Sequence, residues 1–176
     1  KLKPTYKVVK NYYTELDHLM QLSLFTEGAV SPTFAALLRH CARQFNWTLA
    51  EQFSMRARGA AGRAIRVDGA LLDPFKLVHG VWEAKDSDDD LKREVDRKFQ
   101  AGYPQDNILF QAPDRAILWQ DGYEVWDADI TQPPVLVDLL QEFFAYQPPA
   151  FEQWERAVDE FKLQVPNLAA GLLDLI

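Results

Sequence analysis

Apolar residues recur along this chain at two kinds of spacing, and each kind predicts one type of element. Steps of three and four residues predict helices, which we expect at residues 6–24, 31–46 and 89–101 and from 133 to the break at Pro148-Pro149. Short apolar or alternating runs between Gly, Pro, Asn and Asp predict strands. These runs lie at residues 49–55, around Asp68, and at 77–85, 107–111, 116–120 and 123–126.

Helices before, between and after the strands predict an α/β fold with a mixed central sheet of about five strands, covered by helices on both faces. Residues 1–146 carry this pattern and form the expected core domain. Residues 147–176 form a second part, a helical extension or the start of a connector, because apolar side chains return at helical steps after Pro148-Pro149. Its apolar end, NLAAGLLDLI, has no helix cap, which indicates that a further domain follows.

The composition is that of an ordinary globular domain, with 48% hydrophobic residues among 176. The lone Cys41 excludes an internal disulfide and is typical of a reducing compartment. Its place in a helical pattern favours packing over catalysis. No signal peptide and no apolar run of membrane length is visible in the sequence, so we expect a cytoplasmic protein with no membrane partner.

The candidate chemistry lies in one predicted hairpin, whose turn is marked by Asp73-Pro74. A loop centred on residues 75 and 76 places Asp68 opposite Glu83, with Cβ atoms about 4.5 to 5.5 Å apart. Glu83 and Lys85 are two residues apart, so their side chains project from the same face of the strand. A register shifted by one residue would send the two acids to opposite faces.

Two carboxylates and a lysine suit metal-assisted hydrolysis of a phosphodiester. Mg²⁺ is usually held by one or two carboxylates together with phosphate oxygens and waters, and Asp68 and Glu83 supply that ligand set, with Mn²⁺ as an alternative ion. Lys85 can position the attacking water or offset charge on the phosphate. The alternative is a solvent-facing surface pair, worth well under about 1 kcal/mol. The apolar residues 80–82 favour a central strand instead.

Val67-Asp68 followed by Glu83-Ala84-Lys85 resembles the motif of the PD-(D/E)XK nuclease superfamily, with Val in place of the usual Pro. The wider text, VDGALLD and EAKD followed by LKREVDRKFQAGYPQDNILF and RAILWQDG, more closely resembles the N-terminal, Mrr-like nuclease domain of large bacterial restriction-modification polypeptides, the type ISP enzymes among them. The resemblance covers the chain from about residue 27 to residue 146. It implies a bacterial polypeptide that continues into an adenine-specific DNA methyltransferase and, in some members, a helicase.

The same resemblance implies two assisting residues. Nucleases of this kind often carry an acidic residue near the start of the first core helix, and Glu27 is the candidate. The alternative for Glu27 is a favourable interaction with the positive helix N-terminus, worth about 0.3 to 1 kcal/mol. Gln111 is a candidate for a polar group near the scissile phosphate, because related nucleases can place such a group on this strand.

The formal charge of −7 is unusual for a domain that binds DNA, because Lys and Arg that neutralise phosphates supply much of the affinity. A partner domain is therefore expected to supply most of the binding. The basic residues gather in two runs, at 56–66 and 92–98. We expect residues 56–62 to form a mobile loop whose arginines touch phosphates; a solvated loop without a partner is the alternative. The candidates for contacts to the DNA backbone are Arg56, Arg58, Arg63 and Lys92.

Two expectations concern the helix at 89–101. The acidic run at 86–90 precedes and opens it, and we interpret these acids as helix caps rather than as further metal ligands. Leu91, Val95 and Phe99 form a narrow apolar stripe along the helix. The basic residues 92, 93, 97 and 98 are then expected on exposed flanks, either solvated or facing DNA.

Together these features predict a Mg²⁺-dependent endonuclease domain of a restriction-modification enzyme, which hydrolyses double-stranded DNA with a metal-activated water. A transient dimer is one way for such a domain to cut both strands. Two alternatives stay open. One is a catalytically silent docking or structural module that keeps the nuclease architecture, which the negative charge favours. The other is a stand-alone DNA repair nuclease, which shares the chemistry.

Overall fold

The computed structural model describes residues 2–24, 26–58, 63–87, 90–148, 156–162 and 165. The chain divides into two compact units, Lys1–Tyr146 and Gln147–Ile176. In the second unit, residues 156–162 are helical. The elements of the first unit are, in order, α1 (Lys7–Gln21), α2 (Glu27–Arg43), β1 (Thr48–Arg56), β2 (Ala64–Leu72), β3 (Val78–Ala84), α3 (Leu91–Gln100), β4 (Asn107–Gln111), β5 (Arg115–Gln120), β6 (Tyr123–Asp129) and α4 (Pro133–Ala145).

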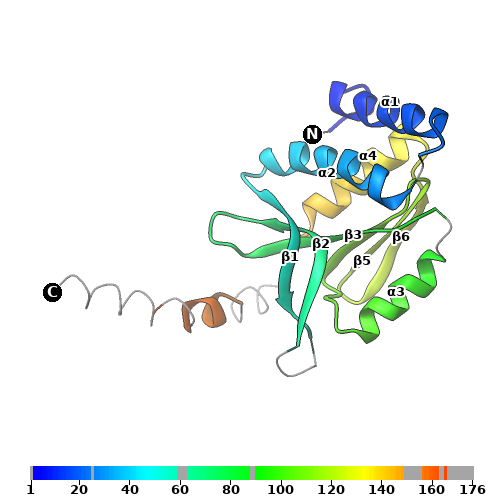
Figure 1. The fold of residues 1–176 in the computed structure, drawn as a ribbon. Coiled ribbons are helices and arrows are strands. Elements are labelled where there is room, and N and C mark those ends of the chain that lie inside the picture. The colour runs from blue at the N-terminus through cyan, green and yellow to red at the C-terminus, as the bar shows by residue number, and fades with distance from the viewer. Residues whose placement is uncertain are drawn as a thin grey trace. The chain divides into compact units, whose positions relative to one another are not determined.

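The strands form one six-stranded sheet in which they follow one another in sequence order, from β1 to β6 (Figure 1). Neighbouring strands are antiparallel except β3 and β4, which are parallel and connected through α3. The predicted mixed sheet of an α/β fold is confirmed, whereas the predicted number of about five strands is wrong. The edge strand β6 pairs with β5 alone and its side chains are mostly exposed, so its apolar pattern gives a weak signal.

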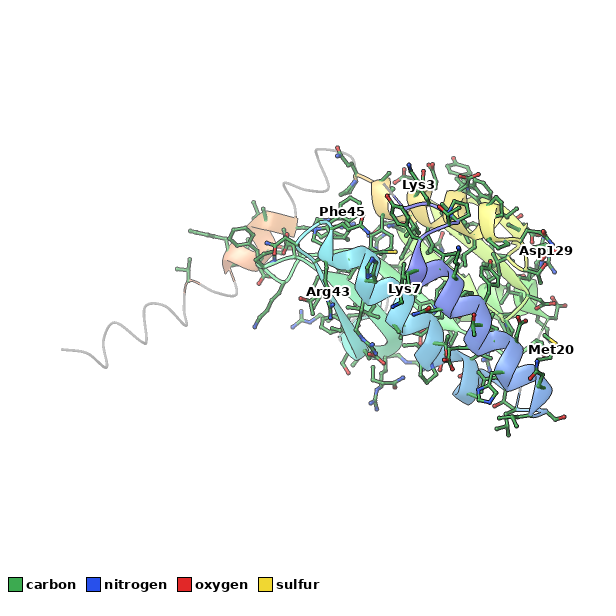
Figure 2. All side chains as sticks on the ribbon, turned by 90° about the horizontal axis from the view of Figure 1, so that it is seen from above. Lys3, Lys7, Met20, Arg43, Phe45 and Asp129 are labelled. Atoms are coloured by element: carbon green, nitrogen blue, oxygen red, sulfur yellow. The ribbon has the colours of Figure 1, made fainter. Side chains whose placement is uncertain are left out.

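Two apolar cores lie on opposite faces of the sheet. Side chains of α1, α2 and α4 form the first core with Leu71, Trp82 and Leu109 of the sheet. Side chains of α3 form the second core with Val67, Val81 and other sheet residues. Figure 1 shows α1, α2 and α4 on one side of the sheet and α3 on the other, and Figure 2 shows α1 and α2 running antiparallel over the first face. In the described part of the chain, no helix is long and apolar enough to cross a membrane.

α2 begins at Glu27, earlier than the helix start expected at Ser31-Pro32. Its N-cap residue makes no side-chain capping bond; instead, the Asp86 carboxylate accepts the backbone N–H of Glu27. Pro32 lies inside the helix and removes the bond that its N–H would have made to the carbonyl of Gly28. The cap comes from a residue distant in sequence, so the local pattern could not reveal where the helix begins.

Cys41 lies in α2, and its side chain is buried in the first core. Burial raises the pKa of its thiol to about 12. A thiol with so high a pKa stays protonated near neutral pH, and the thiolate is the nucleophilic form of cysteine. The residue therefore contributes packing.

A buried amide network ties α4 to the sheet. Asn107 of β4 donates from Nδ2 to the carbonyls of His79 and Phe143, both at 2.9 Å. Its Oδ1 accepts a bond from Gln120 Nε2 at 3.0 Å. Gly80 of β3 lies against the ring of Phe143 and leaves room for it. The network fixes the central strand β3 between its neighbours and the helix above it.

Replacing Gly80 with alanine tests how tightly α4 packs on β3. An added Cβ would lie 2.8 Å from two atoms of the Phe143 ring and 3.0 Å from Asn107 Nδ2. We expect Gly80→Ala to lower the free energy of unfolding, measured by chemical denaturation, by about 1 to 3 kcal/mol, because a filled core must shift to admit the methyl group. Gly28→Ala is the control: nothing lies within 4 Å of its added Cβ, and alanine favours the helix. Equal losses in both variants would contradict the packing.

Candidate active site

The candidate site lies where β2 separates from β3. The two strands pair in the order Gly69 with Trp82, Ala70 with Val81 and Leu71 with Gly80. These couples are the ones expected from a turn centred on residues 75 and 76, so the predicted register is confirmed for residues 69–71. Nearer the turn Leu72 pairs with Val78, and the register shifts between Leu71 and Leu72, an irregularity that the prediction did not include. The next couple in that register is Asp68 and Glu83, at which the ladder of paired residues stops.

Side chains replace the missing ladder bonds. The backbone N–H of Asp68 donates to Glu83 Oε1 at 3.3 Å, and the backbone N–H of Ala84 donates to Asp68 Oδ2 at 3.0 Å. Each carboxylate thus holds the backbone of the opposite strand. The two acids are brought together at the sheet, and the charge of Asp68 acts on the Glu83 carboxyl.

The neighbouring strand β1 bends at the same level. Gln52 has a positive φ of 51° and lies between the couples Glu51–Gly69 and Phe53–Val67. In a regular strand, side chains four residues apart point to the same face of the sheet. Here Leu49, before the bend, packs into the first core, whereas Phe53, after the bend, packs into the second core on the opposite face. Gln52 also donates from Nε2 to Asp68 Oδ1 at 3.1 Å. The bend turns the far half of the β1–β2 hairpin toward the α3 side and gives the Asp68 carboxylate a second donor.

Glu83 is a buried carboxylate between two ammonium groups. Only 1% of its surface is exposed. Lys98 Nζ donates to Glu83 Oε2, and Lys85 Nζ lies 3.8 Å from the same oxygen. Burial raises the pKa of the Glu83 carboxyl above its ordinary value, the Asp68 charge adds to that effect, and both lysines oppose it. Lys85 is itself buried and donates to the carbonyl of Ala84 at 2.5 Å.

Lys98 was expected on an exposed flank of α3, and that interpretation is wrong. The Nζ atom donates to Glu83, lies 3.0 Å from the Tyr103 hydroxyl, and stands 4.4 Å from the centroid of the Tyr103 ring. Burial lowers the pKa of the Lys98 ammonium, but the bonds to Glu83 and Tyr103 outweigh it and raise the pKa above its ordinary value. The sequence did hold a signal, because Lys98 follows Val95 at a helical step of three and so shares its buried face.

Glu27 lies at the same end of β3 as Lys85. Its backbone N–H donates to Asp86, the residue that follows Lys85. The expectation that Asp86 caps α3 is therefore wrong, because it caps α2 instead. Asp90 is the N-cap of α3 and accepts the N–H of Arg93 at 3.3 Å, as expected. Asp88 and Asp89, from the same acidic run, lie outside the residues that the structure describes.

Gln111 lies beside the site but on the other face of the sheet. It pairs with Ala84, whose side chain belongs to the first core, whereas Glu83 pairs with Phe110 of the second core. Its carbonyl accepts the N–H of Lys85 at 2.8 Å. Its Nε2 donates to the carbonyl of Ala112 at 2.8 Å, and its buried Oε1 has no partner within the described residues. The register thus joins Gln111 to Lys85 through the backbone alone.

The four predicted DNA-contacting residues differ in what they bind. Arg58 pairs with Asp106, and Lys92 lies 3.5 Å from Glu124 and 3.0 Å from Asp127. Arg56 and Arg63 are exposed on the β1–β2 hairpin, at the end of β1 and just before β2. β1 extends through Arg56, so the loop expected at 56–62 begins later, and residues 59–62 are outside the described ranges.

The ligand chemistry of the site fits a small hard cation. Among the residues that the structure describes, no group of three or more His, Cys, Asp and Glu side chains could hold a metal ion. Asp68 and Glu83 offer two carboxylates. Mg²⁺ usually takes one or two protein carboxylates and completes its shell with waters and phosphate oxygens. The pair therefore fits a cation that also binds its substrate, and not an ion held by protein side chains alone.

Comparisons with known proteins relate the chain to part of a larger molecule. No protein-family model matches it, and no curated protein matches it. A chain in the cryo-electron microscopy structure of the DrdV–DNA complex is similar, with 34% sequence identity and a TM-score of 0.77. The similarity covers 92% of the present chain and 16% of that chain. The present chain therefore spans a small part of the length of a protein that was solved with DNA.

Two substitutions of Asp68 separate its structural role from its charge. Asparagine keeps an oxygen that can accept the N–H of Ala84, whereas alanine leaves that N–H without its partner. We expect Asp68→Ala to lower the free energy of unfolding by about 1 to 3 kcal/mol, the cost of an unsatisfied donor, and Asp68→Asn to lower it by less than about 0.5 kcal/mol. Chemical denaturation without divalent ions measures both. Equal stability of the two variants would show that the bond to Ala84 does not hold the strands together.

Proposed function

We propose that this chain is a DNA endonuclease domain that hydrolyses phosphodiester bonds with a divalent cation, Mg²⁺ or Mn²⁺. The observation that carries the proposal is the convergence of Asp68 and Glu83 where β2 leaves β3, with Lys85 beside them. The similarity to part of a chain solved in complex with DNA supports nucleic acid as the substrate.

Each residue of the site has a defined task in the proposed reaction. Asp68 and Glu83 would hold the cation. When bound, the cation would polarise the phosphate and lower the pKa of a water molecule. Lys85 would orient that water and offset the negative charge that develops on the phosphate. The water would lose a proton to the surrounding solvent, its oxygen would bond to phosphorus, and the bond from phosphorus to one sugar oxygen would break. That oxygen would take up a proton from solvent, and the products would be the two ends of a cut strand.

Glu27 and Gln111 would assist from the flanks of the site. Glu27 begins α2, and its backbone N–H bonds to Asp86, so the residue lies at the end of β3 that carries Lys85. Gln111 would act through its carbonyl, which fixes the backbone of Lys85, since its side chain lies on the opposite face. A direct contact of the Gln111 amide with the scissile phosphate receives no support from this register.

The wider context of the proposal is a restriction-modification polypeptide of the bacterial cytoplasm. Its support is the match to 16% of a longer chain, together with the resemblance described above. Double-stranded DNA is the proposed substrate, and methyltransferase or helicase domains of the same polypeptide are the proposed partners. They would supply most of the affinity that a domain with a charge of −7 lacks. A second copy, recruited transiently, would cut the second strand.

A docking module without catalysis is the second candidate. It is favoured by the ion pairs of Arg58 and Lys92 with acids, and by the contact of Lys98 with Glu83 at the oxygen that a cation would need. Calorimetric titration with Mn²⁺ distinguishes the two candidates. If the wild type binds Mn²⁺ and Asp68→Asn does not, the nuclease is supported. If neither the wild type nor Asp68→Asn binds Mn²⁺, the docking module is supported.

Activity measurements on the full-length protein test the assigned roles. We expect Asp68→Asn and Lys85→Met to slow DNA cleavage at least about 100-fold, because a positioned metal ligand or charged group contributes about that much to the rate. Plasmid nicking in Mg²⁺ measures the rate. Glu51→Gln is the control, since this acid pairs with Arg39 on the exposed side of β1 and should retain wild-type activity. Cleavage at the wild-type rate by either site variant contradicts the assignment.

The salt dependence of DNA binding tests the β1–β2 hairpin. Each arginine that touches a phosphate should contribute about 0.9 to the slope of log affinity against log salt concentration. Arg56→Ala and Arg63→Ala are expected to lower the slope by that amount each. Arg58→Ala and Lys92→Ala should have smaller effects, because these side chains are paired with acids. A slope unchanged by Arg56→Ala and Arg63→Ala would identify a solvated hairpin.

A further inference from the structure

We infer that Lys98 is a positioning residue that stands in for the divalent cation at Glu83 and makes cation binding depend on DNA. The inference rests on the proposed function, since it concerns the same site. Lys98 Nζ bonds to Glu83 Oε2, one of the oxygens that a cation between Asp68 and Glu83 would need. A cation can take that oxygen only when the ammonium group moves away from it.

The charges of the site favour such a dependence. Glu83 contacts two ammonium groups, those of Lys85 and Lys98, and lies close to a second carboxylate, that of Asp68. The formal charges of these four groups cancel. A divalent cation added to this neutral group produces a surplus of positive charge in a buried place, which is costly. A phosphate group of DNA offsets the surplus and gives Lys98 a new partner. The cation and the DNA should therefore raise each other's affinity.

The surroundings of Lys98 allow the side chain to move. Its exposed fraction is 18%, against 1% for the side chain of Glu83, so solvent and ligands can reach it. Its flexible stem comes from α3, whereas Glu83 lies on a central strand. The ring of Tyr103 has its centroid 4.4 Å from Nζ. A cation–π contact with this ring can stabilise the ammonium group when it no longer bonds to Glu83.

The hydroxyl of Tyr103 also holds Lys98 in its present position, beside the departing strand β2. The hydroxyl donates to the carbonyl of Arg66 at 2.7 Å, two residues before Asp68 on β2, and also contacts Lys98 Nζ at 3.0 Å. Lys98 thus contacts Glu83 of β3 directly and the backbone of β2 through Tyr103.

Calorimetric titration with Mn²⁺ in the absence of DNA tests the inference on the full-length protein. Lys98→Met removes the competing ammonium group and is expected to bind Mn²⁺ on the order of tenfold more tightly than wild type, the size expected for loss of one partly buried charge interaction. Arg97→Met is the matched control. It removes the same charge from the adjacent residue, whose side chain is 68% exposed and paired with Glu94, and should leave the affinity unchanged within about twofold.

A second variant, Tyr103→Phe, tests the inference even if Lys98→Met does not fold. Tyr103→Phe keeps the ring but removes the hydroxyl that bonds to Lys98 and to Arg66. It should loosen the hold on Lys98 and tighten Mn²⁺ binding by about two- to threefold. A lysine with a purely structural role predicts the opposite, weaker binding in both variants, because Glu83 would lose its position.

The outcomes separate this inference from the proposed function. If neither the wild type nor Lys98→Met binds Mn²⁺, the proposed function fails. If the wild type binds, Asp68→Asn does not, and neither Lys98→Met nor Tyr103→Phe binds more tightly, only the inference on Lys98 is overturned. Tighter binding in Lys98→Met together with an unchanged Arg97→Met supports it.

Discussion

Two exchanged bonds between carboxylates and backbone hold the centre of this structure. Where the ladder between β2 and β3 stops, Glu83 accepts the N–H of Asp68, and Asp68 accepts the N–H of Ala84. Ordinary pairing would have satisfied these donors through carbonyl groups and would have kept the strands closed. Where the sheet opens, the backbone N–H groups of Asp68 and Ala84 both keep an acceptor through this exchange. The two carboxylates that keep the strands together are also the ones proposed to bind the cation.

The opening lies beside a part of the sheet that is held by several contacts. The central strand β3 is held on one side by β4 and from above by α4, through Asn107 and the close contact of Gly80 with Phe143. β1 follows the departing strand β2 by bending at Gln52. The two acids therefore lie where the bent β1–β2 hairpin meets the part of the sheet that β4 and α4 hold in place. Buried charge at that junction is stabilised by two lysines from different elements, Lys85 of the strand end and Lys98 of α3.

The sequence was sufficient to predict features that depend on residues close together in the chain, such as the pairing of β2 with β3. The turn at Asp73-Pro74 and the alternation of β3 led to the correct couples beyond Leu71, and hence to Asp68 opposite Glu83. They did not reveal the shift between Leu71 and Leu72 that makes this register possible. Contacts between distant elements were beyond its reach: the capping of α2 by Asp86 joins positions on either side of three strands. Lys98 was misjudged for another reason. A charged residue on a helix was assigned to solvent, although its spacing from Val95 placed it on the buried face, where Glu83 and Tyr103 provide partners.

The order of the strands has a consequence for how the protein is made. Each strand in the sheet lies next to its predecessor in the chain, and four of the five pairings join strands that follow one another without an intervening helix. Contacts that are short in sequence form quickly, and domains tend to fold while the ribosome is still at work. Asp68, Glu83, Lys85 and Lys98 all lie within a stretch of 31 residues, so they emerge together. The site can thus begin to assemble during translation, before β5, β6 and α4 close the unit.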